Sequence, residues 1–353
     1  MTAQPERLQV SVLGAGSWGT ALAALASSQA DTLLWARDAA TARAIDQDHR
    51  NPRYLSDIAL PRALHATDDF AGAIRHACDG PSGAGLLILA VPVAGLSATC
   101  ADIARILPPD QCDGLGIVWT CKGFHLETGQ LPHDIAQAAF TGQPGVRLGV
   151  LSGPSFAREV AQGLPVALTI AASANDLVQK VTAVMHGSNA RIYGSHDIIG
   201  VEVGGALKNV MAIACGISDG LGLGTNARAA LITRGLAEMQ RLGVTLGGEP
   251  DTFSGLTGLG DLVLTATGEL SRNRQVGLAI AEGRSLADIL ATGMTAEGVR
   301  CARAALELGR RHQVDLPVTD AVCRVLFQGL APQQAVSELL GREARSELSS
   351  APR

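Results

Sequence analysis

Between residues 8 and 195 the chain alternates short apolar runs with amphipathic stretches. Apolar runs bounded by glycine, proline or polar residues are typical of buried strands, whereas apolar residues recurring every three or four positions are typical of helices. The predicted strands are Leu8–Leu13, Thr32–Ala36, Leu86–Val91, Gly116–Thr120, Arg147–Leu151, Val166–Ala171 and Ala190–Tyr193. The predicted helices are Ser17–Ser28, Ala39–Asp48, Val93–Leu107, Gln130–Ala139 and Asp176–His186. Because strands separated by helices need crossover connections, this part predicts a doubly wound α/β fold with parallel strands.

Beyond Ser195 the strand signals stop, and the rest of the chain is predicted to be helical. The predicted helices are Ile198–Leu221, Arg228–Leu242, Arg274–Ala281, Leu286–Ala291, Thr295–Arg311, Val318–Phe327 and Pro332–Leu340. This change of pattern predicts two domains, an α/β domain at residues 1–194 and an all-helical domain at 195–341. Residues 342–353 are polar and are expected to form a frayed tail.

The composition narrows the possible partners. The chain is 47% hydrophobic and 17% charged, so it can bury a sizeable core. Its 28 Lys and Arg against 33 Asp and Glu give a net charge of −5, which argues against nucleic acid as a partner. An anionic ligand must therefore be held by a few local cations rather than by the field of the whole molecule.

The apolar runs and the cysteines favour a cytoplasmic protein. The longest apolar stretch, Gly85–Leu96, is broken by Pro92 and is shorter than the roughly 20 residues of a membrane span. The seven cysteines are odd in number and show no CxxC spacing, which predicts reduced thiols and no metal site. Cys121 is the one thiol whose neighbour, Lys122, is expected to lower its pKa.

The first strand runs directly into a GxGxxG turn, which then opens a helix. In a turn of this kind Gly14 permits the tight bend, Gly16 lets the backbone approach a pyrophosphate, and Gly19 lets helix and strand pack closely. The amide groups at the start of the helix offer a partial positive charge to the same pyrophosphate. The turn therefore predicts a Rossmann-type dinucleotide site.

The end of the second strand bears on the choice of dinucleotide. An acidic residue there is usual for NAD, because it accepts hydrogen bonds from the ribose hydroxyls. Here Arg37 occupies that place and offers a planar cation to a 2′-phosphate, which favours NADP. Asp38 follows it and keeps NAD possible. The alternative is an arginine that stacks on adenine or points into solvent.

Two lysines are candidates for the chemistry. Lys122 follows a predicted strand, at the edge where doubly wound sheets bind ligands. Lys208, followed by Asn209, interrupts an apolar helix, and a desolvated lysine has a lowered pKa that suits proton transfer. The alternative for Lys208 is a surface lysine that extends from a helix edge.

Three further groups carry candidate ligand-binding residues. The turn at 152–156, which includes Gly153 and Ser155, is either part of a site or a simple capped turn. Asp261 lies between glycine-rich residues, one helical turn before Thr265. The hydroxyl, guanidinium and amide groups of Ser271, Arg272 and Asn273 precede a helix and suit a phosphate monoester. The alternative there is a capped helix with solvated arginines.

These motifs together resemble NAD(P)-dependent glycerol-3-phosphate dehydrogenases of the bacterial biosynthetic type, over roughly residues 8 to 340. The segments that carry the resemblance are GAGSWGTALA at 14–23, TCKG at 120–123, LSGPSFAREV at 151–160, GGALKNV at 204–210, GLGDLVLT at 258–265 and SRNR at 271–274. The resemblance implies interconversion of dihydroxyacetone phosphate and sn-glycerol 3-phosphate, which supplies the backbone of phospholipids.

The resemblance also implies roles for individual residues. Lys208 is implied as the proton donor and acceptor. From the residue chemistry, Lys122 is expected to lower the pKa of Lys208 as a nearby like charge, and Asn209 and Asp261 are expected to hold Lys208 in position. The implied cofactor-binding residues are Gly14, Gly16, Ser17, Trp18, Gly19, Arg37, Tyr54, Lys122, Ala157, Arg272, Thr295 and Glu297. The implied substrate-binding residues are Lys122, Gly153, Ser155, Lys208, Asp261, Thr265, Ser271, Arg272 and Asn273.

Two other functions are compatible with parts of the pattern. A related β-hydroxyacid dehydrogenase, acting on 6-phosphogluconate or 3-hydroxyisobutyrate, also has a lysine–asparagine pair but lacks the GLGDL and SRNR segments. A non-catalytic NADPH-sensing regulator has no need for Lys208, Asp261 and Arg272 together. The apolar helix Ile198–Leu221 indicates either a homodimer interface or a buried core helix. The sequence leaves open NADP against NAD, the physiological direction, feedback inhibition and the oligomeric state.

Overall fold

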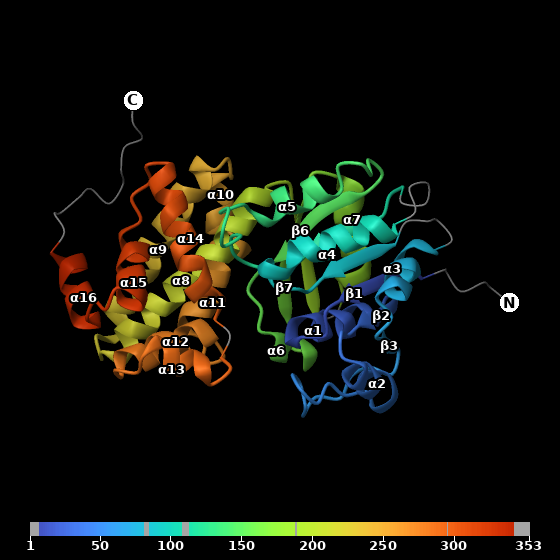
Figure 1. The fold of residues 1–353 in the computed structure, drawn as a ribbon, viewed down its shortest axis with the longest axis horizontal. Coiled ribbons are helices and arrows are strands. Elements are labelled where there is room, and N and C mark those ends of the chain that lie inside the picture. Colours follow the sequence, from blue (N-terminus) through green and yellow to red (C-terminus); the bar gives the residue numbers. More distant parts are fainter. Residues whose placement is uncertain (1–6, 81–84, 108–112, 188, 295, 342–353) are drawn as a thin grey trace.

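The protein has two halves that lie side by side, a sheet half and a helical half (Figure 1). The computed structural model describes residues 7–80, 85–107, 113–187, 189–294 and 296–341. The predicted tail at 342–353 lies outside these residues. The α/β sheet followed by an all-helical half confirms the predicted fold class.

The sheet half is built on one eight-stranded sheet with the strand order β3-β2-β1-β4-β5-β6-β7-β8. Its strands are β1 (Gln9–Leu13), β2 (Asp31–Trp35), β3 (Leu64–Thr67), β4 (Leu86–Leu89), β5 (Gly116–Trp119), β6 (Arg147–Ser152), β7 (Val166–Ala172) and β8 (Ala190–Ser195). The order reverses between β1 and β4, which is the position where doubly wound sheets bind ligands.

Helices cover both faces of this sheet. They are α1 (Ser17–Ala26), α2 (Ala39–Asp48), α3 (Phe70–Cys78), α4 (Val93–Ile106), α5 (Pro132–Ala139), α6 (Ala157–Ala161) and α7 (Asn175–Met185). Along β4, Leu86 and Ile88 join the apolar cluster under α1, α2 and α7, whereas Leu87 and Leu89 join the one under α3, α4 and α5. Burial on both faces explains why this strand is a continuous apolar run.

Two features of the sheet differ from the prediction. The expectation of parallel pairing throughout was wrong at one place, because β6 and β7 are antiparallel. The chain reverses at Gly153, whose φ of +137° favours glycine, and the short helix α6 does not return it for a parallel pairing. The strand β3 and the helix α3 were not predicted from the sequence. Leu64 is the one buried residue of β3, so this strand has almost no apolar pattern to indicate it.

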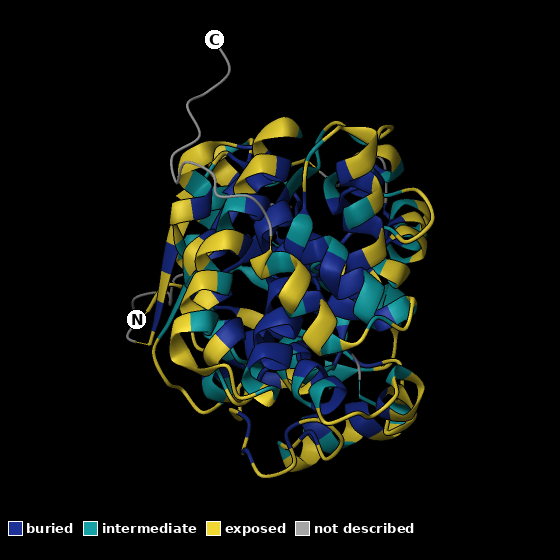
Figure 2. Ribbon diagram, turned by 90° about the vertical axis from the view of Figure 1, so that its left-hand side faces the viewer, coloured by how far each residue is buried: buried dark blue, intermediate teal, exposed yellow. Residues whose placement is uncertain are grey.

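The helical half surrounds α8 (Ile198–Gly220), which is buried from Gly200 to Ser218. Around it lie α9 (Gly224–Thr245), α10 (Pro250–Ser254), the π-helical turn η1 (Leu256–Gly260), α11 (Asp261–Thr267), α12 (Arg272–Ala281), α13 (Leu286–Ala291), α14 (Glu297–Arg311), α15 (Pro317–Phe327) and α16 (Pro332–Leu340). The residues from 250 to 267, to which no helix was assigned from the sequence, are helical. Figure 2 shows the exposed residues on the outer faces of these helices and the buried ones inside.

Helix α8 is long and apolar enough to cross a membrane by length and composition, but 89% of that window is buried within the protein. Among the described residues it is the one helix that meets this criterion. The sequence was compatible with either a homodimer interface or a buried core helix here, and the structure shows the buried core helix. The burial of α8 therefore removes the reason for expecting a homodimer interface on this helix.

Candidate active site

The glycine turn between β1 and α1 has the form that a pyrophosphate needs. A Cβ at Gly14 would lie 2.6 Å from the carbonyl oxygen of Ala90, and one at Gly19 would collide with the carbonyl oxygen of Gly14. A Cβ at Gly16 would meet nothing within 4 Å, so the space in front of this residue is open. No side chain caps the start of α1, where Ser17 and Trp18 are half-buried. The residues present therefore fit a dinucleotide phosphate group at this turn.

The end of β2 presents a cation rather than a carboxylate. Arg37 is exposed there. The Asp38 carboxylate instead caps α2, accepting hydrogen bonds from the amide (2.9 Å) and hydroxyl (2.7 Å) of Thr41. These hydrogen bonds lower the pKa of Asp38. The carboxylate of Asp38, which could otherwise accept hydrogen bonds from the ribose of NAD, thus caps helix α2.

The loop after α2 is attached directly beneath the glycine turn. Asn51 is buried, and its amide nitrogen donates to the carbonyl oxygen of Ala15 (3.0 Å) and to the hydroxyl of Thr20 (2.8 Å). Tyr54, which is exposed, lies in this loop with the guanidinium of Arg53 above its ring. Asn51 was not predicted as a site residue. A polar residue in a proline-containing loop is only a weak indication that its side chain fixes the loop to the glycine turn.

Lys122 and Lys208 meet on a single carboxylate. The Nζ of Lys122 donates to Oδ2 of Asp261 at 2.6 Å, and the Nζ of Lys208 donates to Oδ1 of the same residue. Lys208 also donates to the hydroxyl of Thr265 at 2.9 Å. Lys122 follows β5 in the sheet half, whereas the other three residues lie on α8 and α11 in the helical half. The structure therefore brings together four candidates from three separate segments of the chain.

Burial sets the electrostatics of this cluster. Asp261 is fully buried and Lys208 is 6% exposed. Loss of water lowers the pKa of Lys208 to about 8, with the positive charge of Lys122 acting in the same direction and Asp261 opposing it. Burial alone would raise the pKa of Asp261, but the two ammonium groups hold it below its usual value. An amine with a pKa near 8 exchanges protons readily at physiological pH.

The turn after β6 lies against the same lysines. Lys122 Nζ is 3.5 Å from the carbonyl oxygen of Gly153, to which the Ser155 hydroxyl donates at 3.2 Å. A Cβ at Gly205 of α8 would lie 3.3 Å from the Ser152 hydroxyl and 3.4 Å from Cγ of Lys122. Ala157, the first residue of α6, is half-buried. Gly205, not singled out from the sequence, thus lets α8 approach this turn closely.

A chain of amides links α8, α12 and α14. Asn209 donates to a carboxylate oxygen of Glu297 (3.4 Å) and accepts from Asn273 (2.9 Å), whose own oxygen accepts from the amide of Gly298 (3.0 Å). Of the two residues expected to hold Lys208 in position, Asp261 does so, together with Thr265. Asn209 is hydrogen-bonded to Glu297 and Asn273 instead. Thr295 lies outside the described residues.

The start of α12 carries the expected donors in different environments. Ser271 caps the helix by accepting a hydrogen bond from the amide of Arg274 (3.2 Å), and Arg272 is exposed at the first helical position. Arg274 pairs with Asp219 (2.7 Å), which also binds Arg228. The helix cap formed by Ser271 therefore leaves the guanidinium of Arg272 exposed at the start of α12. Arg274, in contrast, forms an ion pair with Asp219.

None of the six cysteines among the described residues belongs to this group of site residues. All six are buried, and Cys112 lies outside the described residues. The expectation of a lowered pKa for Cys121 was wrong, since burial and the charges of Glu202 and Glu297 raise it well above the ordinary value. Among the described residues, no group of three or more His, Cys, Asp or Glu side chains is placed to hold a metal ion.

Comparisons with known proteins agree with this arrangement. Residues 9–178 match the family model for the N-terminus of NAD-dependent glycerol-3-phosphate dehydrogenase, and residues 197–337 match the model for its C-terminus. Proteins named glycerol-3-phosphate dehydrogenase (NAD(P)+) from Burkholderia cenocepacia and Burkholderia lata are 56% and 55% identical over 341 residues, which is 96% of this chain and 100% of each relative.

A solved structure supports the same relationship. The glycerol-3-phosphate dehydrogenase from Coxiella burnetii is 38% identical, with a TM-score of 0.86, covering 96% of this chain and 100% of that one. The match thus extends over both halves and over the glycine turn, the lysine pair and Asp261. The chain therefore belongs to the NAD-dependent glycerol-3-phosphate dehydrogenase family.

Proposed function

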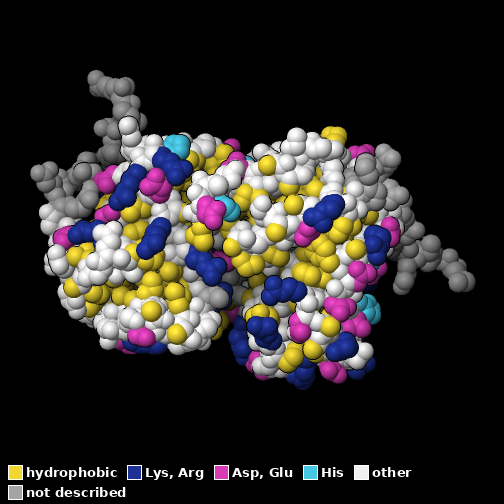
Figure 3. Space-filling model, in the orientation of Figure 1, with side chains coloured by type: hydrophobic (Ala, Val, Ile, Leu, Met, Phe, Trp, Pro, Cys, Tyr) yellow, Lys and Arg dark blue, Asp and Glu magenta, His cyan; other side chains and the backbone are white. Residues whose placement is uncertain are grey.

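We propose that this protein is an NAD(P)-dependent sn-glycerol-3-phosphate dehydrogenase that interconverts dihydroxyacetone phosphate and sn-glycerol 3-phosphate. The observation that carries the proposal is the meeting of Lys208 and Lys122 on Asp261, between the two halves. The relatives at 56% identity bear the same name over the full matched length. Figure 3 shows Lys and Arg side chains near the boundary between the halves, together with a notch at its lower end.

The sheet half holds the dinucleotide in this proposal. The turn Gly14–Gly19 and the start of α1 receive the pyrophosphate, and Arg37 receives a 2′-phosphate, so NADP is preferred and NAD is usable. The remaining cofactor contacts proposed are Ser17, Trp18, Tyr54, Lys122, Ala157, Arg272, Thr295 and Glu297. When bound, the nicotinamide supplies the hydride.

Lys208 supplies the proton in this proposal. Reducing a ketone to an alcohol requires a proton on oxygen, and an ammonium group with a pKa of about 8 donates one readily. In the reverse direction the neutral amine accepts the proton from the alcohol. Asp261 and Thr265 hold Lys208 in place, and Lys122 stabilises negative charge that develops on the oxygen.

The phosphate of the substrate binds at the start of α12. Arg272 offers a bidentate guanidinium there, and Ser271 and Asn273 add polar donors beside the helix N-terminus. Gly153 and Ser155 are proposed as further substrate contacts, beside Lys122. Binding energy from this non-reacting group orients the carbonyl toward Lys208.

The cellular setting follows from the proposed reaction. We propose a cytoplasmic enzyme that supplies sn-glycerol 3-phosphate for phospholipid synthesis. The net charge of −5 supports the expectation that nucleic acid is not a partner. A homodimer stays a prediction.

The activity is tested by following cofactor oxidation spectrophotometrically with dihydroxyacetone phosphate, in parallel with NADPH and NADH. Turnover with this ketone, and none with 6-phosphogluconate or 3-hydroxyisobutyrate in the oxidative direction, is expected. Absence of turnover with dihydroxyacetone phosphate would overturn the proposal.

The same assay tests the proton donor. Lys208→Ala should lower kcat by about 10²–10⁴, the usual range for loss of a general acid. Lys180→Ala is the control, because Lys180 is a partly buried lysine that donates to the carbonyl oxygen of Gly114 (2.5 Å) on the sheet half. Near-normal kcat in Lys208→Ala would remove this residue from the mechanism.

A further inference from the structure

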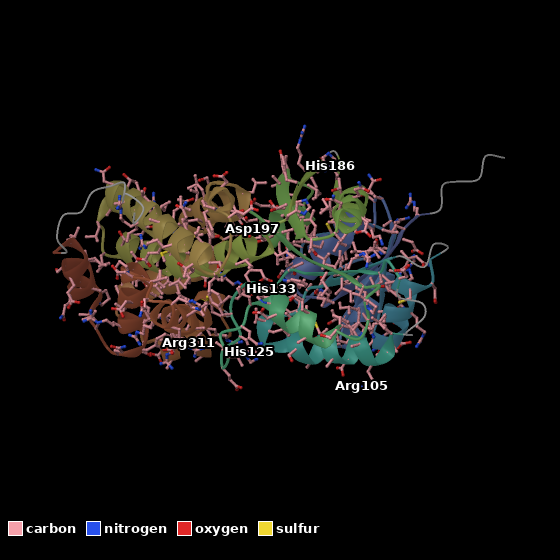
Figure 4. The ribbon with its side chains drawn as sticks, turned by 90° about the horizontal axis from the view of Figure 1, so that it is seen from above. Arg105, His125, His133, His186, Asp197 and Arg311 are labelled. Carbon is pink, nitrogen blue, oxygen red and sulfur yellow. The ribbon has the colours of Figure 1, made fainter. Side chains whose placement is uncertain are left out.

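A buried carboxylate that the proposed mechanism does not use lies between the two halves. Glu202 is 4% exposed on α8, six positions before Lys208. Its Oε1 accepts hydrogen bonds from the indole of Trp119 (2.7 Å) and from the backbone amide of His133 (2.9 Å). Its Oε2 lies 2.6 Å from Nδ1 of the His133 ring. All three contacts cross from the helical half to the sheet half, and Figure 4 shows His133 at their boundary.

The two partners of Glu202 enclose the segment that carries Lys122. Trp119 ends β5, three positions before Lys122, and His133 lies in the first turn of α5, where the segment ends. Between them, Phe124 and Leu131 pack into the apolar core of the helical half. One carboxylate on the helix of Lys208 therefore holds both ends of the segment of Lys122.

We propose that Glu202 is a positioning residue that clamps the segment Trp119–His133 to α8 and so fixes the distance between the two lysines. The proposal deepens the proposed function, since it matters for turnover only if Lys208 and Lys122 act in the reaction. A clamp is needed here because Lys122 and Lys208 repel each other, and Asp261 alone joins them.

Burial and neighbouring charges shift the pKa values of both His133 and Glu202. Burial alone would lower the pKa of His133, but the hydrogen bond to Glu202 and the charges of Glu202 and Asp134 raise it. His133 Nε2 lies 3.3 Å from a carboxylate oxygen of Asp134, so the ring lies between two carboxyl groups. Burial raises the pKa of Glu202, and His133 and Trp119 oppose this effect. Cys121, the other titratable group beside Glu202, stays a neutral thiol because its pKa is raised.

The clamp is tested first on the protein without substrate or cofactor. Competitive acetylation of lysines across pH, read by peptide mass spectrometry, gives the apparent pKa of Lys208 directly. The wild-type midpoint is expected near 8. In Glu202→Ala, release of the Lys122 segment should admit water and raise the midpoint by about one unit or more. Glu202→Gln keeps an acceptor for Trp119 and His133 and should restore most of the wild-type value.

Two further variants separate positioning from general destabilisation. Glu238→Gln is the matched control, because Glu238 is also buried and accepts three hydrogen bonds, from the amides of Val318 and Thr319 and the hydroxyl of Thr319, but all within the helical half. It should leave the Lys208 midpoint unchanged. Trp119→Phe removes one hydrogen bond to Glu202 without leaving an unpaired charge buried. This variant serves as the test if Glu202→Ala does not fold. It should also raise the Lys208 midpoint.

Kinetics supply the second readout. Glu202→Ala should lower kcat by about 10²-fold, as expected for a small misplacement of a catalytic group, while the Kd for NADPH in direct fluorescence titration stays nearly unchanged. An unchanged Lys208 midpoint in folded Glu202→Ala or Trp119→Phe, or an equal shift in Glu238→Gln, overturns the clamp. A shifted midpoint in a protein that does not turn over dihydroxyacetone phosphate overturns the proposed function and leaves the clamp intact.

Discussion

Lys208 shows how far the environment of one residue decides its chemistry. On the surface a lysine is protonated throughout the physiological range, whereas burial beside Lys122 brings the pKa of Lys208 to about 8. Asp261 keeps the ammonium form accessible by supplying the opposite charge. The two protonation states are therefore close in free energy at neutral pH, which a residue that both donates and accepts a proton requires.

The pH dependence of the two directions should have opposite signs. Reduction of dihydroxyacetone phosphate needs the ammonium form, so kcat/KM should fall as pH rises through about 8. Oxidation of sn-glycerol 3-phosphate needs the neutral amine, so its kcat/KM should rise over the same range. Initial rates in both directions between pH 6 and 10 measure this. Profiles that are flat, or that share one sign, would contradict the role of Lys208.

Arg37 provides the second prediction at this scale. Arg37→Gln removes the cation proposed to face the 2′-phosphate and should weaken NADPH binding by about tenfold or more, with little effect on NADH. Binding is measured by fluorescence titration of each cofactor. Arg43→Gln, an exposed arginine on the neighbouring helix α2, is the control and should change neither Kd. Equal losses for NADPH and NADH in Arg37→Gln would contradict a 2′-phosphate contact.

At the scale of secondary-structure elements, close approach of backbones positions the site. Helix α8 crosses α12 at Gly216 and Gly277, where a Cβ on Gly277 would lie 2.7 Å from the backbone nitrogen of Ile217. Helix α12 begins with the donors at 271–273, and α8 carries Lys208. Small residues at this crossing therefore set the distance between the proposed phosphate site and the proposed proton donor.

Gly216→Ala tests this crossing. A Cβ at Gly216 would collide with the carbonyl oxygen of Arg274 and lie 3.0 Å from Cα of Gly277, so we expect a loss of about 1–3 kcal/mol in the free energy of unfolding. Gly95→Ala in α4 is the matched control, because a Cβ there meets nothing within 4 Å. That helical substitution should stabilise the protein by about 0.5–1 kcal/mol. Urea denaturation measures the free energy of unfolding of both variants. Equal changes in the two variants would contradict a tight crossing of α8 and α12 at Gly216.

At the scale of the whole molecule, several polar contacts among the described residues join the halves, and the contact between Lys122 and Asp261 lies at the site itself. Lys122 reaches Asp261 at 2.6 Å, His133 binds Glu202 at 2.6 Å, and Arg311 donates to the carbonyl oxygen of Thr128 at 3.4 Å. Figure 4 shows His125, His133 and Arg311 along this boundary. Because the groups proposed for catalysis also hold the halves together, changes at the site should affect the stability of the whole protein.

Asp261→Asn should show this coupling. It leaves one buried and one partly buried ammonium group without their counter-charge, and breaking a buried ion pair of this kind costs about 3 kcal/mol or more. Asp57→Asn is the control, because its ion pair with Arg158 is exposed and should contribute little. Urea denaturation at pH 7 compares the two variants. Similar stabilities for both would show that the Asp261 cluster does not hold the halves together.

The sequence alone was sufficient to predict much of the fold. Apolar periodicity revealed the alternation of strands and helices, because each element must bury an apolar face. The glycine turn was recognisable because its conformation admits few residues. The strand β3 was missed because Leu64 alone is buried in it, and the antiparallel β6–β7 pair because pairing direction depends on the path of the chain after Gly153.

Only the tertiary structure decided how these residues act on one another. Lys122 and Lys208 lie 139 and 53 positions before Asp261, and no periodicity predicts that both ammonium groups pair with its buried carboxylate. The same holds for Glu202, which the sequence presents as one polar residue in an apolar helix and the structure places between Trp119 and His133. Residue types determine which chemistry is available, but burial and distance determine pKa values, and these arise only when remote segments pack together.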